Sequence, residues 1–520
     1  MAYLLHQLVE QSAQRSPLSP ALLFKDQVLD YATLWHRIDG MADALAALGL
    51  SSDQRVAIYL PKQPETVVFM FAALAAGGVF VPVNPILKPE QVGHILRDCD
   101  VSVLVTSAAR AALLSEQVDN SPALQHLILV DDQPVEIDCT LPVHSMDTLP
   151  QGQPRAARPR IDADLAAILY TSGSTGRPKG VVLSHANMLA GARSVAEYLH
   201  NTAEDRLLAV LPFSFDYGLS QLTTAFLVGA SVVLMDYLLP RDVIRAVSRY
   251  GITGLAAVPP LWNQLAALEW PEEAVASLRY LTNSGGAMPV ATTRALRAAL
   301  PETQIYLMYG LTEAFRSTYL DPQLVDQRPD SMGKAIPNAQ VMVVRPDGSE
   351  CAVDEPGELV HRGALVAQGY WNDPHKTAQR FRPAPGQPNG LVNPEIAVWS
   401  GDQVRRDSEG FLYFIGRSDE MIKTSGYRVS PGEIEEVVLI LEEVEQAVAL
   451  GVPHPMLGHA IVLVAQARCT ADEILLHCRA QLPLYMLPGH VELLDELPRN
   501  ANGKIDRALL GQLHRQRFTD

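Results

Sequence analysis

The stretch ILYTSGSTGRPKGVVLSH, residues 168–185, concentrates glycines, hydroxyl side chains and a lysine between two apolar runs. The run at 166–170 predicts a strand that enters the stretch, and the β-branched run from Val181 predicts a strand that leaves it. Glycines let backbone amides approach a ligand, and hydroxyls and a lysine donate hydrogen bonds to phosphate oxygens. The stretch therefore predicts a phosphate-binding loop at the tip of a β-hairpin.

The spacing of this loop excludes a Walker loop, the phosphate loop of kinases and ATPase motors. The Walker pattern G-x-x-x-x-G-K-[ST] needs a second glycine where this sequence has Pro178, counted from Gly173, or Val181, counted from Gly176. A Walker loop also leads from a strand into a helix, whereas a second strand is expected here. The residues predicted to hold phosphate are Thr171, Ser172, Gly173, Ser174, Thr175, Gly176 and Lys179.

Composition narrows the class of protein. The chain has 520 residues, 48% of them hydrophobic, and a formal net charge of −17. This acidity argues against nucleic-acid or anionic-membrane binding, because both need a basic surface. The five cysteines form no CxxC pair and the N-terminus lacks the pattern of a signal peptide, so we expect a cytoplasmic protein. The apolar run at 67–83 is shorter than the roughly 20 residues of a membrane-spanning helix and reads better as a buried helix followed by a buried strand.

Hydrophobic periodicity predicts an α/β fold. Strand-like runs at 55–60, 79–83 and 101–106 alternate with helical patterns at 34–48, 65–76 and 89–99, which is typical of a largely parallel sheet. The alternation returns after residue 205, and shorter, turn-rich strands after residue 339 predict a small β-rich subdomain. We expect a large N-terminal domain over residues 1–417 and a small, mobile α+β C-terminal domain over 418–520.

The loop YTSGSTGRPKGV resembles the signature of the AMP-forming adenylating superfamily, which contains acyl-CoA synthetases, peptide-synthetase adenylation domains and luciferases. Four further motifs of that superfamily recur in order: YGLTE (309–313), GELVHRGALVAQGYWND (357–373), SGDQVRRDSEGFLYFIGRSDEMIKTSGYRVSPGEIE (400–435) and NANGKIDR (500–507). The stretches GLTEAFRSTYL and TSGYRVSP look more narrowly like the stand-alone acyl-CoA ligases of the exosortase-associated type. The resemblance covers nearly the whole chain.

The resemblance implies a two-step reaction. A carboxylate attacks the α-phosphate of ATP to give acyl-AMP and pyrophosphate, and a thiol then displaces AMP. Lys504, Lys179 and Glu313 match the catalytic positions, and Glu313 also matches the ligand of Mg²⁺. The implied nucleotide site adds the adenine-pocket residues Gly285, Gly286 and Ala287 and the YGLTE residues Tyr309, Gly310 and Thr312, of which Tyr309 matches the residue that stacks on adenine. It also adds the ribose residues Asp402 and Arg417.

The resemblance also implies that the C-terminal domain rotates between the two steps. Asp419 matches the hinge position. Rotation about it is expected to withdraw Lys504 and to bring in the KTSGYRVSP loop for thioester formation. Lys423, Gly426 and Arg428 of that loop would then lie near the thiol, which belongs either to CoA or to the phosphopantetheine of a carrier protein acting in trans.

The acid is left open by the motif LPFSFDYGLSQ (211–221), which aligns with the substrate side of the family and places Phe215, Asp216 and Tyr217 in the pocket. Amino-acid-activating relatives use an aspartate at the position of Asp216 to hold the substrate ammonium. Arg316 maps to the far wall of the same pocket. It could neutralise Asp216 permanently, or it could bind a second carboxylate of the substrate. Amino acids and amine-free organic acids therefore both remain candidates.

The leading hypothesis is an ATP-dependent, AMP-forming acid–thiol ligase acting on a small carboxylic acid. The alternatives are a stand-alone amino-acid adenylation enzyme that loads a carrier protein in trans and, more remotely, a nucleotide-binding homologue without turnover. The last alternative predicts lost catalytic residues, whereas Lys179, Glu313, Asp402, Arg417 and Lys504 are all present.

Overall fold

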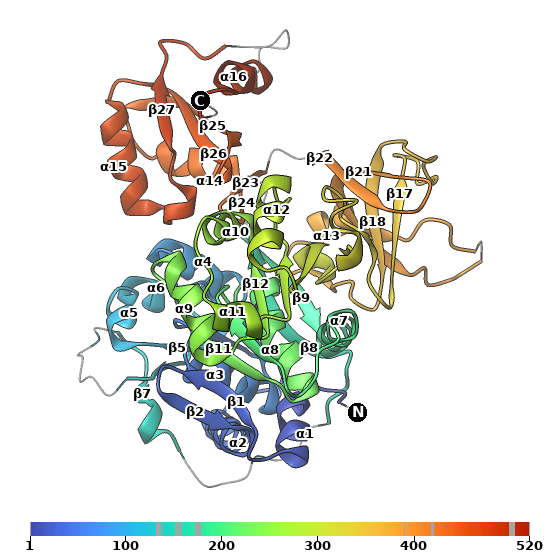
Figure 1. Cartoon of the computed structure of the whole chain (residues 1–520). Helices are drawn as coiled ribbons and strands as arrows, with labels where there is room; N and C mark the ends of the chain where they lie inside the picture. Colours follow the sequence, from blue (N-terminus) through green and yellow to red (C-terminus); the bar gives the residue numbers. More distant parts are fainter. Residues whose placement is uncertain are drawn as a thin grey trace.

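The computed structural model of the chain describes residues 2–131, 137, 139–150, 155, 159–171, 178–388, 390–417, 421–498 and 505–518. It has a large N-terminal domain, a small β subdomain beside it and a C-terminal domain above it (Figure 1). The predicted mixed α/β fold with a large N-terminal and a small C-terminal domain is confirmed. The proposed boundary at 417/418 adjoins residues 418–420, which lie outside the described residues.

The first of two large sheets is parallel in its centre and antiparallel at its edges. It has nine strands, in the order β16 (Lys334–Ala335), β15 (Thr318–Tyr319), β14 (Gln304–Tyr309), β13 (Tyr280–Asn283), β12 (Gly254–Ala257), β10 (Arg206–Ala209), β11 (Ser231–Leu234), β1 (Pro20–Phe24) and β2 (Gln27–Asp30). The strands from β14 to β1 run parallel, in the alternation with helices that the sequence predicts after residue 205.

The second large sheet contains the predicted hairpin. Its order is β19 (Gly369–Tyr370), β9 (Lys179–Ser184), β8 (Leu165–Thr171), β4 (Val79–Pro82), β3 (Arg55–Tyr59), β5 (Val101–Thr106), β6 (His126–Leu129) and β7 (Val143–Ser145). Strands β8 and β9 pair antiparallel, with Thr171 opposite Lys179, so the strand–loop–strand prediction is confirmed. The tip itself, Ser172 to Arg177, lies outside the described residues.

Helices α2, α3, α7 and α8 pack with both sheets in one continuous apolar core. The helices of the large domain are α1 (Gln7–Arg15), α2 (Tyr31–Ala47), α3 (Pro64–Ala75), α4 (Pro89–Asp98), α5 (Ala108–Ala112), α6 (Ser115–Asp119), α7 (His185–Tyr198), α8 (Asp216–Val228), α9 (Pro240–Tyr250), α10 (Pro259–Ala266), α11 (Glu272–Ser277) and α12 (Val290–Ala299), with 3-10 turns η1 (Met146–Thr148), η2 (Thr312–Ala314) and η3 (Pro322–Leu324). The apolar run at 67–83 forms buried α3 and buried β4. Among the described residues, no helix combines the length and the apolar character that crossing a membrane requires.

The small β subdomain has β17 (Ala339–Val344), β18 (Gly357–Gly363), β21 (Ile396–Arg406), β20 (Phe381–Pro383), β22 (Leu412–Arg417) and helix α13 (Pro374–Arg380). The C-terminal domain has β23 (Ile422–Thr424), β24 (Tyr427–Val429), β25 (Val444–His454), β26 (Gly458–Ala467), β27 (His490–Leu493), α14 (Pro431–Val438), α15 (Ala471–Gln481), η4 (Leu484–Met486) and α16 (Arg507–His514).

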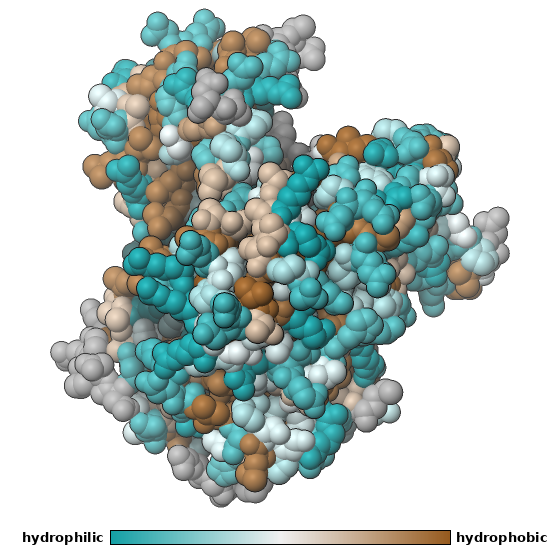
Figure 2. Space-filling view, in the orientation of Figure 1, coloured by the Kyte–Doolittle hydropathy of each residue, from teal (hydrophilic) through white to brown (hydrophobic). Residues whose placement is uncertain are grey.

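The C-terminal domain has its own core. Separate apolar clusters cover the two faces of its sheet, one with α14 and α15 and the other with α16. In Figure 1 the β23–β24 hairpin points down to the large domain, whereas α16 lies at the far end. Brown, apolar atoms gather over the C-terminal domain in Figure 2, whereas the large domain is mostly hydrophilic on this face. The domain thus has apolar clusters of its own and places the β23–β24 hairpin against the large domain.

Candidate active site

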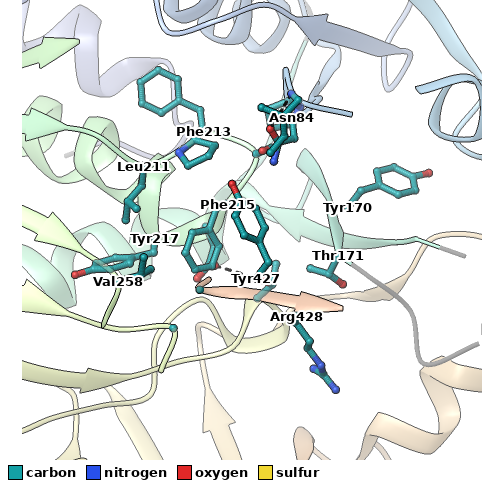
Figure 3. A pocket seen from close by; sticks show the side chains of 18 of the residues that line it. Asn84, Tyr170, Thr171, Leu211, Phe213, Phe215, Tyr217, Val258, Tyr427 and Arg428 are labelled. Carbon is teal, nitrogen blue, oxygen red and sulfur yellow. Dashed lines mark hydrogen bonds between the residues drawn. The ribbon is translucent and has the colours of Figure 1, made fainter. Parts of the chain in front are cut away.

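A cavity of about 510 Å³ lies where the carboxyl ends of the strands in both large sheets meet the C-terminal domain. Its walls include Thr171 at the end of β8, Phe215 after β10, Gly285 after β13 and Gly310 after β14. Ligands of open α/β sheets bind at this edge of the sheet. In Figure 3, Phe215, Tyr217 and Val258 lie on one side of the cavity and Thr171 lies on the other. The sequence motifs, which are far apart in the chain, therefore converge on one site.

A buried polar group stands at the phosphate side of this cavity. The hydroxyl of Tyr370 donates to Glu313 Oε1 at 2.6 Å and accepts from Lys179 Nζ at 2.7 Å. Lys179 Nζ also lies 3.5 Å from Glu313 Oε1, and all three side chains are buried. Glu313 belongs to the cavity wall. The structure thus brings the predicted phosphate lysine and the predicted metal glutamate together, and Tyr370 connects them.

Burial and neighbouring charges have opposing effects on the pKa values of Lys179 and Glu313, and both pKa values end below their usual range. Burial lowers the pKa of Lys179 to about 8, although Glu313 opposes the shift. Burial would raise the pKa of Glu313, but the charges of Lys179 and Arg428 and the hydrogen bond from Tyr370 hold it at about 2. Glu313 is therefore ionised at neutral pH, and Lys179 is only partly protonated above pH 8.

Tyr370 is a residue that sequence reasoning missed. It lies inside the quoted motif GELVHRGALVAQGYWND, but nothing in its spacing predicts a contact with Lys179, which is 191 positions away. Strand β19 places Tyr370 there, because β19 pairs with β9 and Lys179 is the first residue of β9. Its sequence signal is its place in the quoted motif GELVHRGALVAQGYWND.

The ribose side is formed by β21 and β14. Tyr309 donates a hydrogen bond through its hydroxyl to Asp402 Oδ2, and both side chains are buried. The backbone register places Asp402 opposite Arg417 on β22. Asp402 lines the cavity, and the Tyr309 ring packs into the core of the small β subdomain. The carboxylate therefore reaches the cavity wall with Tyr309 bound to it, and the expected stacking of Tyr309 on adenine stays a prediction.

The predicted adenine loop follows β13. Gly285 has φ +78°, and a Cβ on it would lie within ordinary contact of Phe215 and of the Gly426 carbonyl, at 3.6 and 3.7 Å. Gly285 lines the cavity together with Gly310 and Thr312, whereas Gly286 is half-buried behind it and Ala287 is exposed. The structure thus brings the first glycine of this motif to the site and leaves Ala287 outside the cavity wall.

The acid side of the cavity contains an ion pair. Arg316 Nη1 lies 2.8 Å from Asp216 Oδ2, and both side chains are almost completely buried. Asp216 is the first residue of α8, and Thr312 Oγ1 lies 3.4 Å from its other oxygen. Burial raises the pKa of Asp216, and the Arg316 guanidinium opposes that rise. Gly218 completes the motif FDYG, because a Cβ there would lie 2.1 Å from the Pro212 carbonyl oxygen.

The C-terminal hairpin closes the cavity. Ser425 and Gly426 both have positive φ, at 52° and 81°, which suits the two-residue turn between β23 and β24. A Cβ on Gly426 would come within 2.9 Å of Val258, so the turn packs directly against the large domain. In Figure 3, Tyr427 points toward Phe215 and Arg428 points the other way, as expected for neighbours on a strand. Lys423 also lines the cavity.

A second contact between the domains involves α4 and α14. Gln91 Nε2 donates to Glu433 Oε1 at 3.0 Å, and burial raises the pKa of Glu433 to about 7. Helix α4 also reaches the phosphate hairpin, since His94 Nε2 lies 3.0 Å from the Pro178 carbonyl oxygen. Sequence reasoning missed Glu433, whose charge looks like that of an ordinary solvated glutamate in SPGEIE.

Several predicted residues cannot be placed. The loop residues Ser172, Gly173, Ser174, Thr175 and Gly176, the hinge Asp419 and the lysine Lys504 all lie outside the described residues. Their roles remain predictions. Helix α16 begins shortly after Lys504 in the chain.

Family models agree with the motifs. Residues 9–371 match the model described as AMP-binding enzyme, and residues 433–504 match the model of the AMP-binding enzyme C-terminal domain. The chain belongs to the AMP-binding enzyme family. The resemblance to the AMP-forming adenylating superfamily is thereby confirmed, and this AMP-binding enzyme is an adenylating ligase by family.

Curated relatives of the enzyme act on different acids. It is 34% identical to the L-proline–[L-prolyl-carrier protein] ligase of Pseudomonas fluorescens, over 98% of this chain and 99% of the relative. It is 31% identical to the long-chain-fatty-acid–CoA ligase of Escherichia coli O157:H7, over 96% of this chain and 92% of the relative. It is also 30% identical to tyrocidine synthase 3 of Brevibacillus parabrevis, but it spans only 8% of that protein.

Two solved structures of one relative, o-succinylbenzoate CoA synthetase from Bacillus subtilis, differ in their fit. The TM-score is 0.83 against a double mutant bound with its product analogue OSB-NCoA, at 26% identity over 97% of this chain and 98% of that chain. It is 0.68 against the complex with the acyl-adenylate intermediate OSB-AMP, at 27% identity over 97% of each chain. The parts of this chain are therefore arranged more like those of the product-analogue complex.

Proposed function

We propose that this AMP-binding enzyme is an ATP-dependent acid–thiol ligase that forms AMP. The observation that carries the proposal is that two groups of residues meet at one cavity. The first group is Glu313 in the cavity wall with Lys179 and Tyr370 behind it, and the second is the tip of the C-terminal hairpin, which also lines the cavity. The first group suits phosphate and the second suits a thiol that arrives between the domains. A kinase transfers a phosphoryl group and binds no thiol, so the second group favours a ligase over a kinase.

In the first step a carboxylate oxygen bonds to the α-phosphorus of ATP, and the bond from that phosphorus to the bridging oxygen of pyrophosphate breaks. Both reactants are anions, so the site must neutralise charge and align them. Lys179 supplies one positive charge, Asp402 accepts hydrogen bonds from the ribose hydroxyls, and Gly285 leaves room for the base. Lys504 is the proposed adenylation lysine.

The residues present fit a magnesium ion that arrives with the nucleotide. Glu313 is an ionised, buried carboxylate in the cavity wall, and Mg²⁺ is commonly held by one or two carboxylates plus phosphate and water oxygens. Among the described residues, no cluster of three or more histidine, cysteine, aspartate or glutamate side chains forms a separate metal site. When bound, the ion would neutralise charge on the leaving pyrophosphate.

In the second step the thiol sulfur bonds to the acyl carbon, the acyl carbon–oxygen bond breaks, and AMP leaves with the former carboxylate oxygen while the thiol proton is lost to solvent. The proposed conformation for this step is the one described here. Its support is the packing of Gly426 against Val258 and the greater likeness to the product-analogue complex. Asp419 would be the hinge between the two conformations.

The acceptor is proposed to be CoA or the phosphopantetheine of a carrier protein. Loading of an amino acid onto a carrier in trans is the second candidate, favoured by the full-length likeness to the proline–carrier-protein ligases. We further propose a cytoplasmic location. All five cysteines are free thiols, which supports this proposal. A homologue without turnover is disfavoured, because Lys179, Glu313 and Asp402 keep a compact arrangement around the cavity.

The proposal is tested by carboxylate-dependent exchange of labelled pyrophosphate into ATP. Aliphatic acids, aromatic acids and amino acids are each assayed with and without Mg²⁺. At least one class should support exchange, and a competition between CoA and a holo carrier protein then identifies the acceptor. Intact ATP binding without exchange for any acid would contradict the proposal.

A further inference from the structure

We infer that the acid is amine-free, because Arg316 already occupies the aspartate that would hold a substrate ammonium. The inference rests on the proposed function and narrows its substrate class to monocarboxylic acids with an uncharged, mainly apolar body. It concerns the pair Asp216–Arg316, two side chains that line the cavity and contact each other.

The first support is that Asp216 has its counter-ion without a ligand, while Nε and Nη2 of Arg316 have no hydrogen-bond partner within the described residues. Arg316 Nη1 contacts Asp216 Oδ2 at 2.8 Å, and the two side chains are 2% and 4% exposed. Carboxylate and guanidinium cancel each other's charge at that distance. An ammonium brought up to Asp216 would also approach Arg316, so attraction and repulsion would offset each other while the ammonium still lost its hydration.

The second support is that Arg316 is held in place by groups other than Asp216. The same Nη1 donates to the Phe315 carbonyl oxygen at 2.7 Å. The guanidinium carbon lies 4.8 Å from the centre of the Tyr217 ring and 5.5 Å from that of Phe315. A cation fixed against two rings is a permanent counter-ion. It is not an arm that swings away to admit an amine.

The third support is the chemistry of the surrounding wall. The cavity wall also includes the apolar side chains of Leu211, Phe213, Phe215, Val258 and Leu311. The charged pair Lys62–Asp236 in the same wall is neutral, with Nζ and Oδ1 2.7 Å apart. Glu313 lies near enough to act on the pKa of Asp216, but Lys179 balances it. The wall therefore offers apolar contact to the body of the acid and no unbalanced charge to a substituent.

The inference is tested with matched acids that differ only in the amine. Pyrophosphate exchange is compared for 4-methylpentanoate and L-leucine, for cyclopentanecarboxylate and L-proline, and for 3-phenylpropanoate and L-phenylalanine, with glutarate as the diacid. We expect kcat/KM of the better amine-free acid to exceed that of its amino counterpart at least tenfold. A preference for the amino acid or for glutarate would overturn the inference while leaving the ligase intact. No exchange with any acid would overturn the proposed function itself.

A variant separates the counter-ion role from mere structure. Arg316→Met leaves Asp216 unbalanced, so the ratio of amino to amine-free activity should rise at least tenfold. Arg279→Met is the matched control, because Arg279 pairs with buried Asp205 at 2.7 Å outside the cavity wall, and it should leave the ratio unchanged.

A second variant tests the same role in case Arg316→Met does not fold. The double variant Asp216→Asn/Arg316→Gln removes both charges and keeps a polar side chain at each position. It should keep the wild-type preference for amine-free acids. An unchanged ratio in Arg316→Met, or a ratio in the double variant that rises as far as in Arg316→Met, would show that Arg316 does not act as the counter-ion.

Discussion

Single residues decide how the phosphate side of the cavity works, and Tyr370 is the one whose role follows most directly from its contacts. Its hydroxyl accepts from Lys179 and donates to Glu313, so one oxygen orients both groups. The hydroxyl is therefore proposed to be a positioning group for the lysine and for the metal carboxylate.

Tyr370→Phe keeps the ring and removes the hydroxyl. A buried hydrogen bond to a charged group contributes about 1.5–3 kcal/mol, so we expect adenylation to fall by roughly tenfold to a hundredfold. The KM for Mg²⁺ should rise as well, because Glu313 loses its fixed orientation. Exchange kinetics over a Mg²⁺ titration provide the measurement. A lower melting temperature with unchanged KM for Mg²⁺ would reduce Tyr370 to a packing residue.

Lys179 predicts a pH dependence. Its pKa is lowered to about 8, so the side chain is charged below that pH and loses its charge as the pH rises through it. In the exchange assay kcat/KM for ATP, which reports the free enzyme, should fall about tenfold for each pH unit above 8. In Lys179→Arg the guanidinium stays charged and this alkaline decline should disappear, even at a lower overall rate. The same decline in both proteins would assign it to another group.

At the scale of elements, the β23–β24 hairpin and α4 connect the two domains. The hairpin turn fits against Val258 only because Gly426 has no side chain, and α4 touches both Glu433 of the C-terminal domain and the carbonyl of Pro178 beside the phosphate loop. Docking of the C-terminal domain and the position of the phosphate hairpin are thus joined through one helix.

Gly426→Ala should block docking of the hairpin, because the new Cβ would lie within 2.9 Å of Val258. Thioester formation from supplied acyl-adenylate should fall at least tenfold, whereas pyrophosphate exchange should stay within about twofold of wild type. Gly410→Ala is the control, since Gly410 has a similar φ of +87° but its Cβ would approach only the Lys334 side chain at 3.9 Å. Equal losses in both half-reactions would argue against separate conformations.

Glu433 predicts that docking weakens as the pH rises. Burial raises its pKa from 4.5 to about 7, so the docked state binds the proton more tightly and loses stability between those two values, with no further loss above them. Glu433→Gln should remove this dependence and strengthen docking at pH 7.5 by up to about 3 kcal/mol. Energy transfer between labels on the two domains, measured from pH 4.5 to 8, reports the change. A wild-type signal that does not vary with pH would contradict it.

The elements also mark what the sequence could predict. The β8–β9 hairpin, the buried α3 and β4 and the short strands after residue 339 follow from local periodicity and turn residues, and the structure confirms them. The contacts between elements do not follow. Tyr370 meets Lys179 only because β19 joins β9, and Asp216 meets Arg316 only because the ends of β10 and β14 lie at one edge of a sheet. The motifs predicted Asp216 and Arg316 as pocket residues, but only the structure shows that the two side chains form an ion pair.

At the scale of the whole molecule, the enzyme is a large α/β domain with a cavity at the strand ends and a small domain that presents one hairpin to it. The arrangement resembles the product-analogue complex of o-succinylbenzoate CoA synthetase more than its acyl-adenylate complex. Figure 1 shows the hairpin at the cavity and α16 at the opposite end of the C-terminal domain. We propose that this arrangement is the one that the enzyme uses in the second step.

The central claim is that a carboxylate attacks the α-phosphorus of ATP and that AMP later leaves with one of its oxygens. It is tested most directly by using the best acid of the exchange panel, labelled with ¹⁸O in its carboxylate, in a complete reaction with ATP and thiol. The account predicts one ¹⁸O atom in each AMP formed and none in pyrophosphate. Label in inorganic phosphate with release of ADP, or AMP without label, would contradict it.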